Sequence, residues 1–307
     1  MKIPFERTIA GAYRFAFSNI LSVIGICWFP YLILSAMAGG LLYLLWPQIQ
    51  DLVAAIQTGH GPDPAKFQST FRLFLTAYGV LIPAFLIIGA MVTVGMMRKA
   101  LGQHPSPVFV FFSLGSQVWR LVGAYFLLAL LFYGMIIVLA VVVGGVWAGL
   151  NRYSAPAATP VAVTLGIAAG LWCIYAFVRT YFFVPAIVVA ENHIGLRRSW
   201  HLGYGNFWRI VGIILIVSLP IGMAASTISS TMLQLAMTPG MAVQQGPMTN
   251  AEFHKLLAEL LPAARRIGPY YVLVQLLYFA LLAGLSAGAV ATAYKAVTGD
   301  TEAKATV

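Results

Sequence analysis

Six long stretches of this chain contain no charged residue, and they limit what the chain can fold into. They lie between the following pairs of charged residues: Arg14 and Asp51, Arg72 and Arg98, Arg120 and Arg152, Arg152 and Arg179, Arg209 and Glu252, and Arg266 and Lys295. A helix needs about 20 mostly apolar residues to cross the hydrocarbon core of a bilayer. We therefore predict an all-α integral membrane protein with six transmembrane helices, near 20–45, 73–97, 119–149, 161–188, 207–235 and 269–296.

The composition excludes several other classes of protein. Hydrophobic residues make up 61% of the chain and charged residues only 8%, whereas soluble proteins average roughly 25% charged residues. The apolar content argues against disorder. The sequence also lacks the series of ten-residue segments of alternating hydrophobicity that is typical of a membrane β-barrel. The uncharged interval 100–119 is broken by His104-Pro105-Ser106-Pro107, which leaves too few residues for a further span.

The net charge of +10 is explained by the position of the cations around the spans. With six spans, most Lys and Arg residues fall on the side that holds both termini, and the positive-inside rule places that side in the cytoplasm. We expect a multi-pass protein of the bacterial inner (plasma) membrane. Ala36-Met37-Ala38 resembles a signal-peptide cleavage site, but the apolar run continues to Trp46, so we expect the first helix to be retained.

An internal repeat precedes the odd-numbered spans. Residues 12–26 (AYRFAFSNILSVIGI) align without a gap with 199–213 (SWHLGYGNFWRIVGI), and 115–125 (GSQVWRLVGAY) give a shorter third copy. The alignment predicts three parallel helical hairpins, about 5–97, 105–190 and 191–297, in a single membrane domain (1–307) with a short polar tail at 298–307. We hypothesise a pseudo-threefold axis normal to the membrane.

The segment before each aligned Asn is amphipathic, which predicts an interfacial helix followed by an elbow. In the first copy Ile9, Ala12, Tyr13 and Phe17 oppose Arg7 and Arg14, and the Asn is expected to cap the next span. Two interpretations stay open: a purely structural elbow, or recognition of lipid headgroups by the Arg residues. The elbow residues are Asn19, Asn206, Trp119, Trp208, Gly25, Gly123 and Gly212. On the opposite side, 249–264 and 47–71 are predicted to contain amphipathic helices, the latter ended by the turn Gly61-Pro62-Asp63-Pro64.

Motifs for chemistry are missing from the sequence. The five histidines have no metal-ligand spacing, and phosphate-loop, GxSxG and GxGxxG motifs are absent. We therefore predict a protein that is not an enzyme and that has no cofactor and no metal. Gly145-x-x-x-Gly149, Gly166-x-x-x-Gly170 and Gly284-x-x-x-Gly288 are small-residue motifs that favour close helix packing.

Arg179 is the most unusual residue because it lies within a predicted span. An ionisable residue in a span is a functional-site hypothesis, and Arg179 is a candidate for binding a lipid phosphate or a carboxylate of a partner. The alternative is that it extends to the headgroups or pairs with Glu191, next to a bend at Pro185. The candidate residues for lipid or partner binding are Arg179, Glu191, Arg197, Arg198, Arg209, Arg120 and Arg14.

Residues 179–213 resemble a bacterial membrane-domain family. The similarity comprises Arg179, Pro185-Ala186, Glu191 and residues 197–210, RRSWHLGYGNFWRI. It resembles the membrane domain attached to some glycerophosphoryl diester phosphodiesterases and the stand-alone YciC-like integral membrane proteins. The family pattern has Thr-Arg where this chain has Gly203-Tyr204. In fused members a separate soluble barrel carries the chemistry, so the resemblance implies a multi-span membrane module without phosphodiesterase activity.

The sequence supports two classes of function. We expect a non-catalytic protein that binds or organises lipid, or that is an accessory subunit of a larger membrane complex. The expected partners are membrane lipids with anionic headgroups on the cytoplasmic side, and no nucleic acid. The alternative is a transporter or flippase-like carrier of an amphiphile, because the spans offer few polar groups besides Arg179, Gln234 and Gln275.

Overall fold

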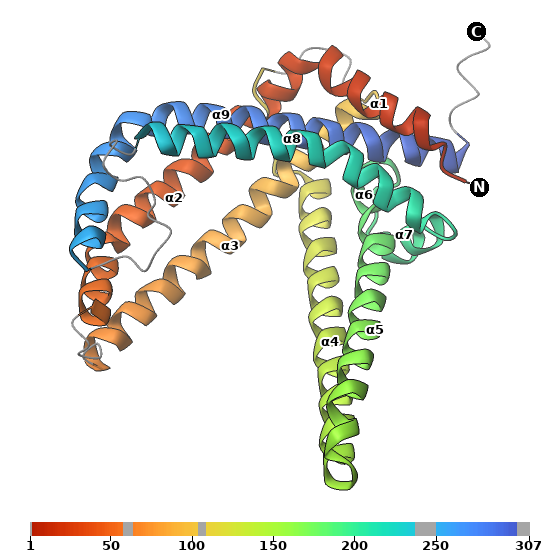
Figure 1. Cartoon of the computed structure of the whole chain (residues 1–307). Helices are drawn as coiled ribbons and strands as arrows, with labels where there is room; N and C mark the ends of the chain where they lie inside the picture. The colour runs from red at the N-terminus through yellow and green to blue at the C-terminus, as the bar shows by residue number, and fades with distance from the viewer. Residues whose placement is uncertain (1, 58–63, 104–108, 237–249, 300–307) are drawn as a thin grey trace.

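The computed structural model describes residues 2–57, 64–103, 109–236 and 250–299, and the regular structure in these residues is entirely helical. The helices are α1 (Phe5–Ser18), α2 (Ile20–Gln57), α3 (Pro64–Ala100), α4 (Ser116–Tyr153), α5 (Ala155–Tyr181), α6 (Val184–Ala190), α7 (Leu196–Leu202), α8 (Phe207–Ala236) and α9 (Asn250–Thr298). Figure 1 shows their arrangement in space.

The predicted fold class is confirmed in the described residues, where six segments are long and apolar enough to cross a membrane. They are Ile20–Gln50, Phe67–Ala100, Ser116–Tyr153, Pro156–Ala190, Phe207–Met232 and Arg266–Thr298. The fourth segment is interrupted near its end, because α5 stops at Tyr181 and α6 begins at Val184. Pro185 has no N–H to donate to the carbonyl group four residues before it, which accounts for the break.

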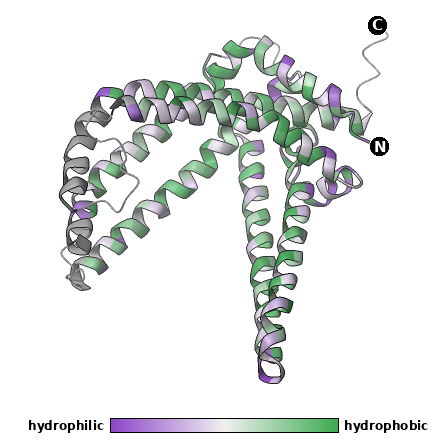
Figure 2. Cartoon of the chain, in the orientation of Figure 1, coloured by the Kyte–Doolittle hydropathy of each residue, from purple (hydrophilic) through white to green (hydrophobic). Residues whose placement is uncertain are grey.

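The long helices form three pairs, α2–α3, α4–α5 and α8–α9, which diverge from a common end (Figure 1). The α4–α5 pair stands apart, whereas α9 packs along α1, α2 and α8. Only 6% and 11% of the most apolar windows of the third and fourth spans are buried, against 39% for the first, second and sixth. The exposed faces are apolar along most of their length (Figure 2), so these helices require a surrounding apolar medium.

The core lies at the common end of the three pairs, which we call the junction. The junction consists of α1, α6, α7 and the adjacent ends of α2, α3, α4, α5, α8 and α9. Helix α6 is at its centre, since every residue from Val184 to Val189 is buried. It packs against α3, α4, α7 and α9. A seven-residue helix therefore joins the three pairs.

Small residues bring α1 close to α9. Gly288 faces Ala12, and a Cβ atom added to Gly288 would lie 3.0 Å from the Cα atom of Ala12. Gly284 faces Val23 and Ala16 in the same way. The predicted close packing at Gly284 and Gly288 is confirmed, because larger side chains would hold the helices apart.

The other two small-residue motifs make no such contact in the part of the chain that is described. A Cβ atom added to any of their glycines would meet no other atom within 4 Å; these are Gly145, Gly149, Gly166 and Gly170. Their faces are exposed on the separate α4–α5 pair.

The interfacial segments differ in detail from the prediction. Helix α1 buries Thr8, Ala12 and Ala16 against its neighbours, while Phe17 is 55% exposed. Of the residues expected on the inward face, Ala12 is buried and Ile9 and Tyr13 are partly buried against the core, whereas Phe17 is not on that face.

The segments expected on the opposite side are continuous with spans. Residues 250–264 are the first part of α9, and residues 47–57 are the last part of α2. Most of the expected turn Gly61-Pro62-Asp63-Pro64 lies outside the described residues, and Pro64 begins α3.

Candidate functional site

The polar side chains of the junction hold three short stretches of chain, which we call the leading segments. They are residues 2–5, 109–111 and 192–194, and each precedes one helix pair. The first is anchored by α8 and the residue before it. The N–H of Ile3 donates to Oδ1 of Asn206 at 3.0 Å, and its carbonyl oxygen accepts from Nη1 of Arg209 at 2.5 Å. The ring of Phe5 lies over Gly212, where an added Cβ atom would be 2.9 Å from the ring.

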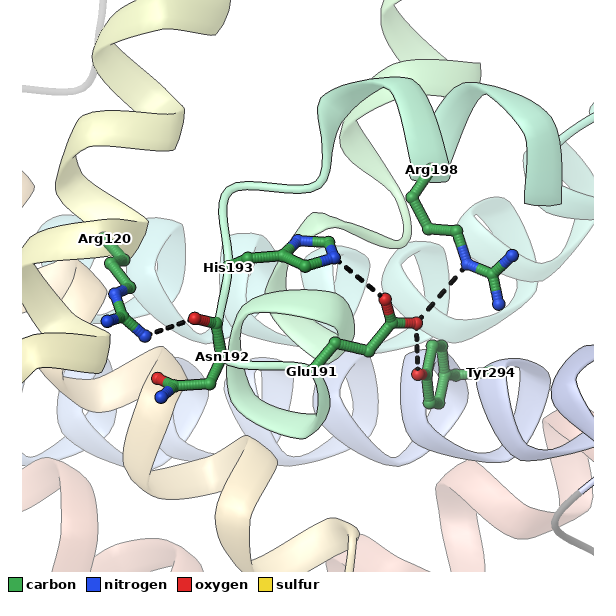
Figure 3. A network of polar contacts seen from close by, with 6 residues as sticks. All are labelled: Arg120, Glu191, Asn192, His193, Arg198 and Tyr294. Carbon is green, nitrogen blue, oxygen red and sulfur yellow. Dashed lines mark hydrogen bonds and ion pairs between the residues drawn. The ribbon is translucent and has the colours of Figure 1, made fainter.

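The leading segment 192–194 is held by α4 in a similar way. Nη1 of Arg120 donates to the carbonyl oxygen of Asn192 (Figure 3). Asn192 has a positive φ of 58°, a conformation that Asn adopts more readily than most residues. The side chain of Ile194 lies 3.6 Å from the position that a Cβ atom would take on Gly123.

The leading segment 109–111 is held by α2 and α3. Nε1 of Trp28 donates to the carbonyl oxygen of Phe109 at 2.7 Å. Phe111 is buried, and its ring lies 2.8 Å from the position that a Cβ atom would take on Gly95. The three cases share one pattern. A side chain of a neighbouring helix pair donates to a carbonyl oxygen of the leading segment, and a glycine of that pair makes room for the side chain two residues further along the segment.

Glu191 is the centre of a second polar cluster, at the end of α6 (Figure 3). Its Oε1 accepts a hydrogen bond from the Tyr294 hydroxyl at 2.7 Å and lies 3.4 Å from Nε of Arg198. Its Oε2 lies 3.2 Å from Nε2 of His193. These contacts connect the end of α6 with α7 and α9, and all three partners come from parts of the chain that follow α5.

A third group of contacts connects α3, α4 and α6. Nε of Arg98 donates to Oε1 of Gln117 at 2.7 Å, and Nε2 of Gln117 donates to the carbonyl oxygen of Val189 at 3.2 Å. Nζ of Lys295 also donates to the carbonyl oxygen of Ala100 at 3.3 Å, which connects α9 to α3. The junction is therefore cross-linked by polar contacts between all three helix pairs.

Arg179 is buried, with only 5% of its surface exposed. Its Nε donates to the carbonyl oxygen of Trp200 at 2.9 Å, and its Nη1 donates to the Tyr175 hydroxyl at 2.8 Å. Its guanidinium carbon lies 4.0 Å from the ring centroid of Trp200 and 4.8 Å from that of Tyr204. The contacts described for Glu191 do not include Arg179. The pairing with Glu191 is thus not among the contacts, and Arg179 attaches α7 to α5.

The remaining predicted cations are on the outside. Arg14 and Arg197 are exposed, and within the described residues neither side chain makes an ion pair or a hydrogen bond. The same end of the molecule has exposed aromatic side chains: Trp208 is 80% exposed, Tyr204 73% and Trp119 52%. Cations and amphipathic rings are thus available on the surface of the junction.

The elbow residues have distinct local roles. The carbonyl oxygen of Asn206 accepts from the N–H of Ile210 at 2.9 Å, which is the backbone position of an N-cap. The carbonyl oxygen of Asn19 accepts from the N–H of Val23 at 2.9 Å in the same way, while its Nδ2 donates to the carbonyl oxygen of Phe15 at 3.1 Å. Gly25 is buried, whereas Trp119 and Trp208 point outward.

Of the predicted site residues, Arg120, Glu191 and Arg198 come together around the chain after α6. Asn206, Arg209 and Gly212 come together around the N-terminal residues. Sequence reasoning missed Ile3, Trp28, Gln117 and Tyr294. Two of them are close in sequence to residues that the sequence analysis used. Gln117 is two residues before Trp119, and Tyr294 is directly before Lys295.

In the part of the chain that is described, no group of three His, Cys, Asp or Glu residues is close enough to hold a metal ion. Comparisons of the chain with protein-family models, with curated proteins and with solved structures gave no match.

Proposed function

We propose that this protein is a non-catalytic, multi-pass protein of the bacterial inner membrane that binds anionic phospholipid headgroups at the junction. The observation that carries the proposal is the difference between the arginines. Arg120, Arg179 and Arg209 donate to groups within the protein, whereas Arg14 and Arg197 are exposed and unpaired among the described residues. Exposed cations beside apolar spans bind lipid phosphates through charge-assisted hydrogen bonds.

The exposed rings of Trp119, Tyr204 and Trp208 support the same conclusion. Trp and Tyr side chains favour the headgroup level because one end is apolar and the other carries a hydrogen-bond donor. The rings would fix the depth of the junction in the cytoplasmic leaflet, with both termini on the cytoplasmic side.

The three-hairpin repeat belongs to this proposal, together with the relationship to the membrane-domain family of phosphodiesterases. The leading segments support the repeat. The segment before the first pair rests on the third, the segment before the third rests on the second, and the segment before the second rests on the first. Such a cyclic order is expected of three equivalent units around one axis. Arg120 and Arg209, which the repeat aligns, both bind a carbonyl group in this way.

Native mass spectrometry of the protein in phospholipid nanodiscs tests the proposal. The chain is compared in phosphatidylglycerol and in phosphatidylcholine, and we expect more retained phosphatidylglycerol. The double variant Arg14→Ala/Arg197→Ala should lose the preference, because the anionic headgroup loses its unpaired cations. The control is Arg152→Ala, an exposed arginine at the other end of α4.

Equal retention of the two lipids by the unaltered chain would contradict the proposal, as would an unchanged preference in the double variant. A second polypeptide retained in fixed ratio after gentle extraction from the native membrane would instead favour the accessory-subunit function.

A further inference from the structure

A cavity lies next to the junction, between the three helix pairs. Its volume is about 230 Å³, and every pair contributes to its wall. The lining includes Met97 of α3, Tyr125 of α4, Tyr181 of α5, Pro185 of α6, Ser218 of α8 and Ser286 of α9. None of these residues belongs to the polar contacts described above.

The wall of the cavity is mostly apolar, and none of the described residues that line it is charged. Two of its hydroxyl groups are used within their own helices: Thr93 donates to the carbonyl oxygen of Gly89 at 2.8 Å, and Ser218 to that of Ile214 at 2.6 Å. Three further hydroxyl groups, of Tyr125, Tyr181 and Ser286, also belong to the wall. A mostly apolar, uncharged wall suits a hydrocarbon better than an ion, because burying an unpaired charge is costly.

The cavity lies at a shallow depth. Met97 is three residues from the end of α3, Tyr125 is nine residues from the start of α4, and Val290 is eight residues from the end of α9. At 1.5 Å per residue these positions are roughly 5–14 Å along the helix axes from the helix ends at the junction. The headgroup layer of a bilayer is roughly 5–8 Å thick on each side. With the junction at the headgroup level, as proposed above, the cavity would be near the first methylene groups of a phospholipid.

Part of the cavity wall is exposed. Tyr181 and Ile214 line the cavity and are 39% and 38% exposed. They belong to α5 and α8, whose helix pairs diverge away from the junction (Figure 1). An entrance between these two helices would face the medium that covers the apolar spans.

We propose that this cavity holds part of one acyl chain of a membrane phospholipid, which enters between α5 and α8. The inference rests on the proposed lipid binding, to which it adds a defined position for the chain. A lipid bound in this way has its headgroup at the level of the junction. The cavity makes binding depend on the hydrocarbon as well as on the charge.

Photo-crosslinking tests the inference. The protein is reconstituted in nanodiscs with phosphatidylcholine that carries a diazirine on one acyl chain, and labelled peptides are mapped by mass spectrometry. We expect adducts on the peptides of Met96, Met97 and Tyr181. Ser218→Phe, which fills the cavity from α8, should abolish these adducts. The matched control is Ser226→Phe, because Ser226 is an exposed serine of the same helix that does not line the cavity.

Ala287→Leu fills the cavity from α9 and replaces Ser218→Phe if that variant does not fold. Labelling spread evenly over exposed span residues, with none on the cavity peptides, would overturn the inference. So would unchanged cavity adducts in both filling variants.

The experiments distinguish a failure of the headgroup proposal from a failure of the cavity proposal. The neutral headgroup of the probe makes cavity labelling independent of Arg14 and Arg197, so Arg14→Ala/Arg197→Ala should keep the adducts. If the cavity inference is wrong and headgroup binding is right, the preference for phosphatidylglycerol persists while the cavity peptides are unlabelled. The reverse result, with labelling but no preference, would reject the headgroup proposal alone.

Discussion

Ile3 donates its backbone N–H to the side-chain amide oxygen of Asn206 across 3.0 Å, although the two residues are 203 positions apart. Both are buried, with exposed fractions of 0% and 1%. The bond attaches the N-terminal residues to the residue before α8, and Arg209 and Gly212 contact the same segment. The leading segment 2–5 is therefore an integral part of the junction rather than a free end.

Replacing Asn206 tests this attachment. In Asn206→Leu the buried N–H of Ile3 loses its acceptor, which costs about 1–3 kcal/mol when a buried donor is left unsatisfied. We expect a lower midpoint of thermal unfolding in detergent and faster hydrogen exchange at residues 2–5. Asn151→Ala, at an exposed position of α4, is the control and should change neither quantity. Unchanged exchange at residues 2–5 in Asn206→Leu would show that the N-terminal segment is held in another way.

The six spans could be predicted from the sequence because the signal is local. An uncharged stretch such as the one between Arg120 and Arg152 predicts a transmembrane helix by itself. This is because a backbone in hydrocarbon must satisfy its hydrogen bonds within the segment. The aligned glycines also carried information, because Gly123 and Gly212 both face the side chain of a leading segment. A glycine that recurs near the start of a span thus indicates a position where another segment of the chain packs against the helix.

The partners of the charged residues could not be predicted in the same way. Arg120 and Arg209 were candidates for binding lipid, but they bind the carbonyl groups of Asn192 and Ile3. A carbonyl group leaves no mark in a sequence, because every residue has one. Gln117 was missed although the repeat places it opposite Asn206, because its partners, Arg98 and the carbonyl group of Val189, are distant in sequence.

Two of the Gly-x-x-x-Gly motifs should respond to Ala substitution in opposite ways, because one is in a close helix contact and the other is exposed. In Gly288→Ala the new Cβ atom would lie 3.0 Å from the backbone of Ala12, so α1 must move away from α9. Overpacking of this kind costs about 1–3 kcal/mol. In Gly145→Ala the new methyl group meets open space, and the lower flexibility of Ala stabilises the helix by up to about 1 kcal/mol.

Thermal unfolding of the two variants in the same detergent gives the comparison. We expect the midpoint to fall in Gly288→Ala and to stay equal or rise in Gly145→Ala. Equal losses in both would mean that Gly145 also lies in a close helix contact, such as one with another copy of the chain.

Glu191 and Tyr294 form the shortest contact of the cluster at the end of α6, at 2.7 Å. A double-mutant cycle with Glu191→Ala and Tyr294→Phe should give a coupling energy of about 0.5–3 kcal/mol, as is usual for residues in one hydrogen-bond network. The control cycle combines Glu191→Ala with Tyr133→Phe, because Tyr133 is an exposed tyrosine of α4. That cycle should be additive. A coupling near zero for the first pair would show that the hydrogen bond does not stabilise the junction.

Arg179 makes a prediction that separates a structural role from a purely electrostatic one. A lysine at this position keeps the positive charge but loses the planar guanidinium that stacks 4.0 Å from the ring of Trp200 and donates to its carbonyl group. We expect Arg179→Lys to release α7 from α5. The loss of a desolvated cation–π contact is worth about 2 kcal/mol. Hydrogen exchange of the backbone at residues 196–203 should then be roughly tenfold faster or more, since about 1.4 kcal/mol corresponds to a factor of ten.

Arg152→Lys is the matched control, because Arg152 is exposed near the end of α4 and far along the chain from α7. This variant should leave the exchange of residues 196–203 unchanged. If Arg179→Lys also left it unchanged, charge alone would be sufficient at this position, and the aromatic contacts with Trp200 and Tyr204 would not hold α7. If instead both Arg179→Lys and Arg179→Met accelerate exchange to the same degree, the shape and hydrogen bonds of the guanidinium hold α7, and its charge contributes little.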